Sequence, residues 1–192
     1  MRGLIARTAR FAPAVIFLLA ATARAQVVTP APLAAGEVTF AIRATKVNDF
    51  VGHAAVARSE FHGDQLAHVT GFAEVQLTEM HTGIGLRDTH MRRAMRADSF
   101  PVIRFELTGV QPGTAQGDSV PAVFDGRMTM HGVTRSVRVN GIVVIHGEET
   151  EIVASFPLDM RDYGIDPPSR FFGAIKVAPL TTVGVSLRFG RM

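Results

Sequence analysis

The fold is decided by the stretch FDGRMTMHGVTRSVRVNGIVVI, residues 124–145. Apolar or small residues stand at every second position up to Met130 and again from Val137, and mostly polar residues stand between them. This period of two is typical of antiparallel strands that have one apolar face and one face in water. The pair His131-Gly132 between the two runs indicates a tight turn. We therefore predict two antiparallel strands joined by a turn.

The same alternation recurs along the chain, in residues 38–42, 67–77, 102–107, 152–158 and 183–189. Together the runs give about seven or eight strands, which is enough to close a small barrel. Glycines inside the runs, at positions 71, 126, 141 and 184, fit the sharp bends of a barrel. Bulges in a β-sandwich would explain them equally well, so the pattern predicts an all-β, antiparallel chain and leaves both architectures open.

One charged segment, residues 87–97, interrupts the strands. Leu86, His90 and Ala94 follow one another at four-residue spacing, which is the spacing of neighbours on one face of a helix. Met91 and Met95 form an apolar pair beside them. Methionine adapts its shape readily, so this pair suits either a core or a lipid cavity. We predict one short helix at about 87–97.

The first 25 residues are typical of a cleavable signal peptide. They combine a basic start, an apolar run over residues 11–21 and the small-residue site Ala23-Arg24-Ala25. That apolar run is about half the length that a membrane-spanning helix needs. We expect an exported chain with an extended lead-in at 26–35 and one barrel domain at 36–190.

Charge and composition exclude several classes of function. The whole chain has 20 basic and 17 acidic side chains, but residues 1–25 hold four arginines and no acids. The remaining chain therefore has a net charge of −1 and lacks the cationic field that nucleic-acid binding requires. The absence of cysteine excludes disulfides, thiolate metal sites and thiol nucleophiles.

The histidines suggest two competing functions, a metal or haem site and an acid–base pair. The chain has seven histidines, which makes a metal or haem site an alternative function. No two of them form an i, i+4 pair on the predicted helix, so we predict no metal ligands. Asp88 and His90 are the candidates for an acid–base pair. Side chains two positions apart on a helix point in different directions, so we expect Asp88 to cap the helix N-terminus, and Arg87 and His90 to bind backbone at the barrel rim. We do not expect an enzyme.

Four blocks of sequence give the chain a family resemblance. They are TGIGLRDTHMR (82–92), FPVIRFEL (100–107), GRMTMHGVTRSVRV (126–139) and FPLDMRDYGI (156–165). In this order they resemble the YceI-like family of polyisoprenoid-binding proteins. The resemblance implies a lipocalin-like, extended, eight-stranded antiparallel barrel in the periplasm that holds a long apolar chain and has no catalytic group. A ligand-free structural or stress-related envelope protein is the alternative.

These expectations name a candidate site. The residues predicted to point into an apolar cavity are Phe40, Ile42, Met91, Met95, Ile103, Phe105, Met128, Met130, Val137, Val139, Phe156 and Leu158. The candidates for a lipid head group or the barrel rim are Arg87, Asp88, His90, Arg135, Arg161 and Tyr163. We expect a bound polyisoprenoid or other long-chain lipid, no obligatory cofactor and no nucleic acid as partner. The sequence leaves open a homodimer and transient contact with a membrane.

Overall fold

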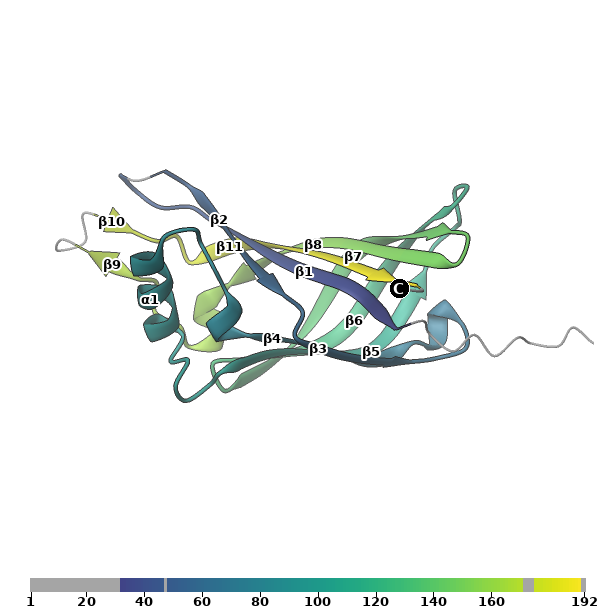
Figure 1. Cartoon of the computed structure of the whole chain (residues 1–192), viewed down its shortest axis with the longest axis horizontal. Helices are drawn as coiled ribbons and strands as arrows, with labels where there is room; N and C mark the ends of the chain where they lie inside the picture. The colour runs from purple at the N-terminus through teal and green to yellow at the C-terminus, as the bar shows by residue number, and fades with distance from the viewer. Residues whose placement is uncertain (1–31, 47, 171–174, 191–192) are drawn as a thin grey trace, which may run out of the picture.

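A computed structural model describes residues 32–46, 48–170 and 175–190. Its main element is an antiparallel sheet of nine strands in the order β2-β1-β11-β8-β7-β6-β5-β4-β3 (Figure 1). These are β1 (Leu33–Ile42), β2 (Phe50–Ala55), β3 (Arg58–His62), β4 (Thr70–Gln76), β5 (Val102–Pro112), β6 (Ser119–Met130), β7 (Val133–His146), β8 (Glu149–Asp159) and β11 (Leu180–Phe189). The expected signal peptide lies outside the described residues.

Shorter elements lie at the two ends of this sheet. They are α1 (Gly85–Ala94), the 3₁₀ helices η1 (Leu66–His68), η2 (Leu77–Glu79) and η3 (Met160–Tyr163), and the small strands β9 (Ser169–Arg170) and β10 (Ile175–Lys176). Figure 1 shows α1 and the β9–β10 pair at one end, which we call the α1 end. The η1 turn lies at the opposite end, which we call the η1 end.

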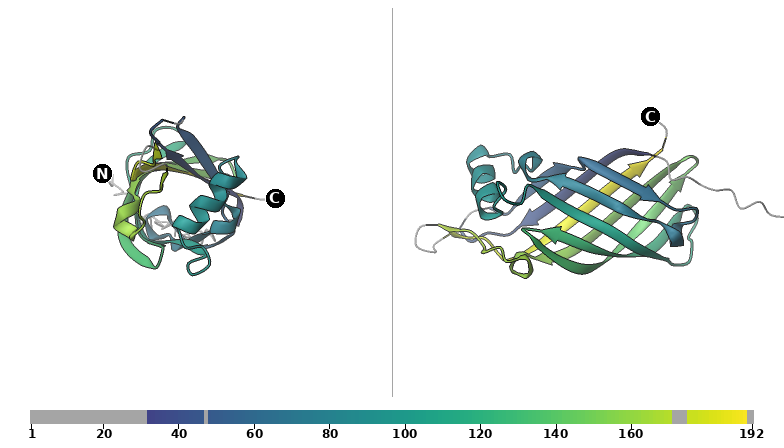
Figure 2. Two further views of the ribbon diagram at one scale, coloured as in Figure 1. Left: turned by 90° about the vertical axis from the view of Figure 1, so that its left-hand side faces the viewer. Right: turned by 90° about the horizontal axis from the view of Figure 1, so that it is seen from below.

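Two consecutive strands close the sheet into a barrel. β2 pairs with β1 at one edge, β3 pairs with β4 at the other edge, and only Val56 and Ala57 separate them. The Val56 N–H donates to the Gly36 carbonyl at 2.9 Å, and the Ala57 N–H donates to the Glu74 carbonyl at 2.8 Å. Hydrogen bonding therefore switches from one neighbour to the other at this point. Figure 2 shows the resulting ring seen along the barrel.

The predicted all-β antiparallel barrel with one short helix is confirmed, with two corrections. The sheet has nine strands instead of eight. The segment that follows β1 forms two short strands, β2 and β3, instead of one long strand. The helix spans Gly85–Ala94 instead of 87–97, since the chain leaves the helical region at Arg96, where φ is 49°. β1 begins at Leu33, within the expected lead-in at 26–35, and residues 26–31 of that lead-in lie outside the described residues.

The turn expected at His131-Gly132 joins β6 to β7. Met130 pairs with Val133 across it, and the two turn residues have φ of 54° and 77°. Two consecutive positive φ angles are the mark of a type I′ turn, whose twist matches that of the strands. His131 Nδ1 donates a hydrogen bond to the Tyr163 carbonyl at 3.0 Å, which ties the turn to η3.

The two faces of the sheet differ as the alternation predicted. The outer face carries cross-strand ion pairs, such as Arg127–Glu106 at 2.8 Å and Arg138–Asp125 at 2.7 Å. The inner face forms two apolar clusters, one toward the α1 end, including Phe40, Met128, Met130 and Leu158, and one toward the η1 end, including Leu107, Val110, Phe124 and Val143. A one-residue slip of any strand would exchange the two faces, so this contrast fixes the register.

Glycine is required where β5 and β6 approach closely. A Cβ at Gly126 would lie 2.5 Å from the Phe105 ring and 2.6 Å from the Glu106 carbonyl, whereas a Cβ at Gly109 would meet nothing within 4 Å. We expect Gly126→Ala to lower the free energy of unfolding by about 1–3 kcal/mol through overpacking. Gly109→Ala, the matched control, should change it by less than about 0.5 kcal/mol. Thermal unfolding of both variants measures the difference, and equal melting temperatures would contradict the close approach.

Candidate functional site

A long cavity of about 1320 Å³ lies inside the barrel. Leu86 and Met91 line it at the α1 end, and Gln65 and Glu148 line it at the η1 end. Alternate residues of β8 from Thr150 to Leu158, and then Met160 beyond them, form one wall. This wall is about 33 Å long at 3.3 Å per residue, or about 25 Å along the axis for strands tilted by about 40°. The cavity therefore runs through most of the barrel.

Most of the residues predicted to face a cavity line this one. They are Phe40, Ile42, Met91, Met95, Ile103, Phe105, Met128, Met130, Val139, Phe156 and Leu158. Val137 does not line it, because its side chain packs against the apolar cluster toward the α1 end. That these residues contact a bound lipid stays a prediction.

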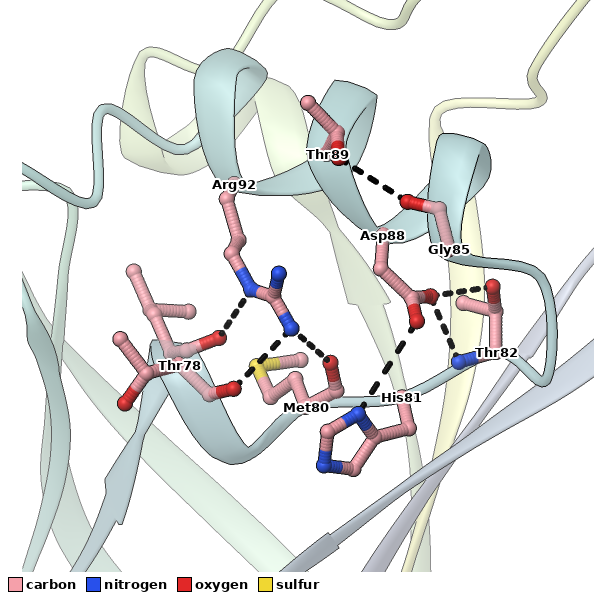
Figure 3. Close-up of polar contacts among 9 residues, drawn as sticks. Thr78, Met80, His81, Thr82, Gly85, Asp88, Thr89 and Arg92 are labelled. Atoms are coloured by element: carbon pink, nitrogen blue, oxygen red, sulfur yellow. Dashed lines mark hydrogen bonds and ion pairs between the residues drawn. The ribbon is translucent and has the colours of Figure 1, made fainter.

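α1 is fixed at the end of the barrel by Arg92, which the sequence reasoning did not single out (Figure 3). Its guanidinium donates to three backbone carbonyls of the preceding segment: Leu77 at 3.4 Å, Thr78 at 3.0 Å and Met80 at 3.5 Å. Arg92 stands four residues after Asp88, one helical turn further on, and this spacing was the only sequence signal that could have indicated a shared role.

Asp88 anchors the start of the same helix, though not as the predicted N-cap. The N-cap position is Ile84, which makes no side-chain cap. The Asp88 carboxylate is buried and accepts hydrogen bonds from the Thr82 N–H at 2.8 Å and the Thr82 hydroxyl at 2.5 Å (Figure 3). It thereby fixes the loop before the helix to the helix itself.

Ionisation of Asp88 reflects two opposing effects. Burial of the carboxyl disfavours the charged form, but the hydrogen bonds from Thr82 and the nearby Arg92 guanidinium outweigh it. The pKa of Asp88 is therefore lowered from its usual value. Oδ1 is bound to Thr82 and Oδ2 lies 3.9 Å from His81 Nδ1, so neither oxygen of Asp88 is paired with His90 as an acid–base pair would require (Figure 3).

Arg87 and His90 lie at the mouth of the cavity instead of binding backbone as expected. Both line the cavity at the α1 end. The guanidinium carbon of Arg87 lies 3.9 Å from the centroid of the Phe50 ring, a cation–π contact. The backbone-binding role predicted for these two side chains belongs to Arg92.

The other three rim candidates hold the η3 segment and do not line the cavity. Arg135 Nε donates to the Asp162 carbonyl at 3.0 Å. Arg161 pairs with Asp159, with Nη2 and Oδ2 2.6 Å apart. Tyr163 is buried, and its carbonyl accepts the hydrogen bond from His131. The structure gives these residues a positioning role at the same end of the barrel.

Two apolar side chains stand exposed beside the mouth. Ile84 is 50% exposed and Leu86 is 68% exposed, and both also line the cavity. Over the described residues, no helix is long and apolar enough to cross a membrane. The same residues contain no group of three or more His, Asp or Glu side chains placed to hold a metal ion.

Comparison with known protein families identifies the family of this chain. A model of the YceI-like domain matches residues 29–189. The chain belongs to the YceI-like family. The resemblance of the four sequence blocks is thereby confirmed. No curated protein is similar enough in sequence to count as a match.

Solved structures show the same fold at low sequence identity. The YceI-like chain is similar to a polyisoprenoid binding domain from Saccharophagus degradans implicated in plant cell wall breakdown, with a TM-score of 0.65 and 12% identity over 85% of this chain and 99% of that one. It is also similar to Burkholderia cenocepacia BcnA, with a TM-score of 0.62 and 14% identity over 80% and 95%. For the Campylobacter jejuni YceI protein, the TM-score is 0.56 at 9% identity over 78% and 85%.

The anchoring of α1 by Asp88 can be tested by mutation. Asp88→Ala leaves two donors of Thr82 without a partner in a buried place, so we expect the free energy of unfolding to fall by about 1–3 kcal/mol near pH 7. The exposed Asp98, on the segment that follows α1, gives the matched control Asp98→Ala, which should change it by less than about 0.5 kcal/mol.

Acid should reduce the difference between wild type and Asp88→Ala. The lowered pKa stabilises the fold at pH values above the unfolded-state pKa of about 3.9. This contribution is lost as pH falls through the folded-state pKa, because the wild-type carboxyl then becomes protonated. Urea unfolding at several pH values measures the effect, and a difference that grows on acidification would rule out this role.

Proposed function

We propose that this YceI-like protein holds one long apolar chain, a polyisoprenoid or a similar lipid, inside its barrel. The observation that carries the proposal is the cavity of about 1320 Å³, whose walls between the two ends are apolar. Pockets for drug-sized ligands usually measure about 300–1000 Å³, so this space fits a larger molecule. The fold shared with a domain described as polyisoprenoid binding supports the same choice.

The cavity is longer than the hydrocarbon region of one bilayer leaflet is thick. One bilayer leaflet has a hydrocarbon thickness of about 15 Å, half of the full core. The wall formed by β8 extends about 25 Å along the axis, as derived from strand rise and tilt. A long apolar chain, prenyl or acyl, can therefore lie extended along the cavity.

Such a site binds by burial and needs few polar contacts. Each methylene that moves from water into the cavity contributes about 0.8 kcal/mol. Ordering the chain and losing its translational freedom offset much of this gain. The expected result is firm binding that tolerates variation in the lipid, with chain length as the main determinant of affinity.

The alternative functions have less support. A ligand-free envelope protein would fill its barrel with its own side chains, and this barrel leaves a large interior space. An acid–base enzyme would need Asp88 directed at a reacting group, whereas its carboxylate is bound to Thr82. A binding role is therefore the function that the geometry supports best.

We also propose export and exchange with a membrane. Residues 1–25 have the pattern of a signal peptide, which directs the protein to the periplasm. The exposed side chains of Ile84 and Leu86 stand beside the mouth, where they suit brief contact with a lipid surface. A carrier that transports lipid, rather than storing it, needs such a point of exchange.

The lipid-holding role can be tested with two neighbouring residues on opposite faces of β8. Ala154 lines the cavity, whereas Val153 is 46% exposed on the outer face. We expect protein purified without detergent to release a long-chain lipid on organic extraction, identified by mass spectrometry. Ala154→Trp should release a shorter lipid or none, because the indole occupies space that the chain needs. Val153→Trp should release the same lipid as wild type.

Stability separates a cavity from a packed core in the same variants. A tryptophan introduced into a packed core would lower the free energy of unfolding by about 1–3 kcal/mol. In an open cavity, the ligand-free Ala154→Trp variant should unfold almost as wild type does. If wild type carries no lipid and takes up no long-chain lipid in solution, the proposed function is wrong.

A further inference from the structure

The two ends of the cavity carry opposite charges. Among the described residues that line it, the charged side chains are Arg87 at the α1 end and Asp64 and Glu148 at the η1 end. Asp64 Oδ1 lies 3.1 Å from His68 Nδ1, and this hydrogen bond lowers the pKa of Asp64 below its usual value. Arg87 therefore places a guanidinium at one end of the cavity, and Asp64 places a carboxylate at the other.

Arg87 makes no hydrogen bond or ion pair with another described residue. Two acids beside it or beside its ring partner in the sequence accept hydrogen bonds from other groups. Asp88 accepts both hydrogen bonds from Thr82, and Asp49, next to Phe50, accepts the backbone N–H of Ala44 at 3.2 Å. The Phe50 ring supports the guanidinium without using its five N–H donors. These donors remain available at the mouth of an apolar cavity.

His90 lies beside Arg87 and adds a second polar group. It follows Arg87 by three residues on α1, so the two side chains share a helix face. Both are partly buried, and both line the cavity at the same end. Over the described residues, His90 also makes no hydrogen bond. An imidazole ring here adds an N–H donor close to the Arg87 donors.

From this arrangement, and resting on the proposed function, we propose that Arg87 and His90 bind the anionic head of an amphiphile, a phosphate or a carboxylate, at the α1 end. Guanidinium binds either group through two parallel hydrogen bonds, which fixes its orientation. Among the lining residues, the α1 end offers a guanidinium and the η1 end offers the Asp64 carboxylate, so the apolar tail points toward the η1 end. The lipid thus has one preferred direction in the barrel, with its head at the mouth beside Ile84 and Leu86.

Three probes with one tail and different heads test the proposal: geranylgeraniol, geranylgeranyl monophosphate and geranylgeranoic acid. Binding to the purified, delipidated full chain is measured by isothermal titration calorimetry. For wild type we expect both anionic probes to bind about tenfold tighter than the alcohol, as one charge-assisted bidentate contact allows. A preference for only one of them identifies phosphate or carboxylate as the head that fits.

Two variants on α1 separate a specific contact from the general charge of the helix. Arg87→Gln should bring both anionic probes to the affinity of the alcohol while leaving the alcohol unchanged. The control Arg93→Gln removes an exposed charge that does not line the cavity, and should preserve the tenfold preference. The unchanged alcohol affinity also shows that Arg87→Gln is folded.

Each remaining result decides against the head-group site alone or against both proposals. If wild type binds the alcohol but binds neither anion more tightly, the head-group site is wrong and the lipid-holding role stands. If Arg93→Gln lowers the preference as much as Arg87→Gln does, no specific site exists. If none of the three probes binds, both the proposed function and the head-group site fail.

Discussion

Closure of the sheet by β2 and β3 is the constraint on which the rest of the structure depends. These two strands follow one another directly, yet each completes the hydrogen bonding of a different edge. β2 and β3 remain the edge strands of the hydrogen-bonded order, but they are consecutive in the chain, so the sheet curls into a ring around its inner face (Figure 2). Apolar residues on that face leave water whether or not they fill the space they enclose. The cavity exists because the closed ring is wider than its inward side chains can fill.

A barrel closed in this way still has two open ends, and α1 covers part of one of them (Figure 2). The helix is attached mainly through polar contacts, with Arg92 on the carbonyls of η2 and its neighbours and Asp88 on Thr82. Met95 adds an apolar contact with the cluster inside. Directed polar contacts fix the position of the helix without requiring the mouth to be packed shut. This explains how Ile84 and Leu86 can stand at the mouth and remain exposed.

Local pattern was sufficient to predict seven strands of the sheet and the direction of their side chains, but no alternating run indicated β2 or β3. Alternation from Phe124 to Ile145 identified the β6–β7 hairpin, its turn and its inner face, because a period of two is a property of neighbouring residues. The closure at Val56 and Ala57 could not be predicted, since it depends on pairing with two distant edges. The role of Arg92 was missed for the same reason: its acceptors are backbone carbonyls 12 to 15 residues earlier, which no side-chain pattern marks. For Arg87 and His90, the sequence placed them at the rim correctly but assigned them the wrong partners.

The cavity also changes how stability and binding are related in this protein. Phe105, Phe156 and Val183 are only partly buried although they point inward, because the space they face is open. Part of the apolar core is therefore incomplete until a chain enters it. A ligand that binds only the folded barrel stabilises it by RT ln(1 + [L]/Kd), about 2.7 kcal/mol at a concentration 100 times the Kd. In this barrel, that gain comes from the same contacts that would complete the core. Larger wall residues would occupy the space that a chain needs and would weaken binding, so the incomplete core is the physical condition for the proposed binding of a lipid.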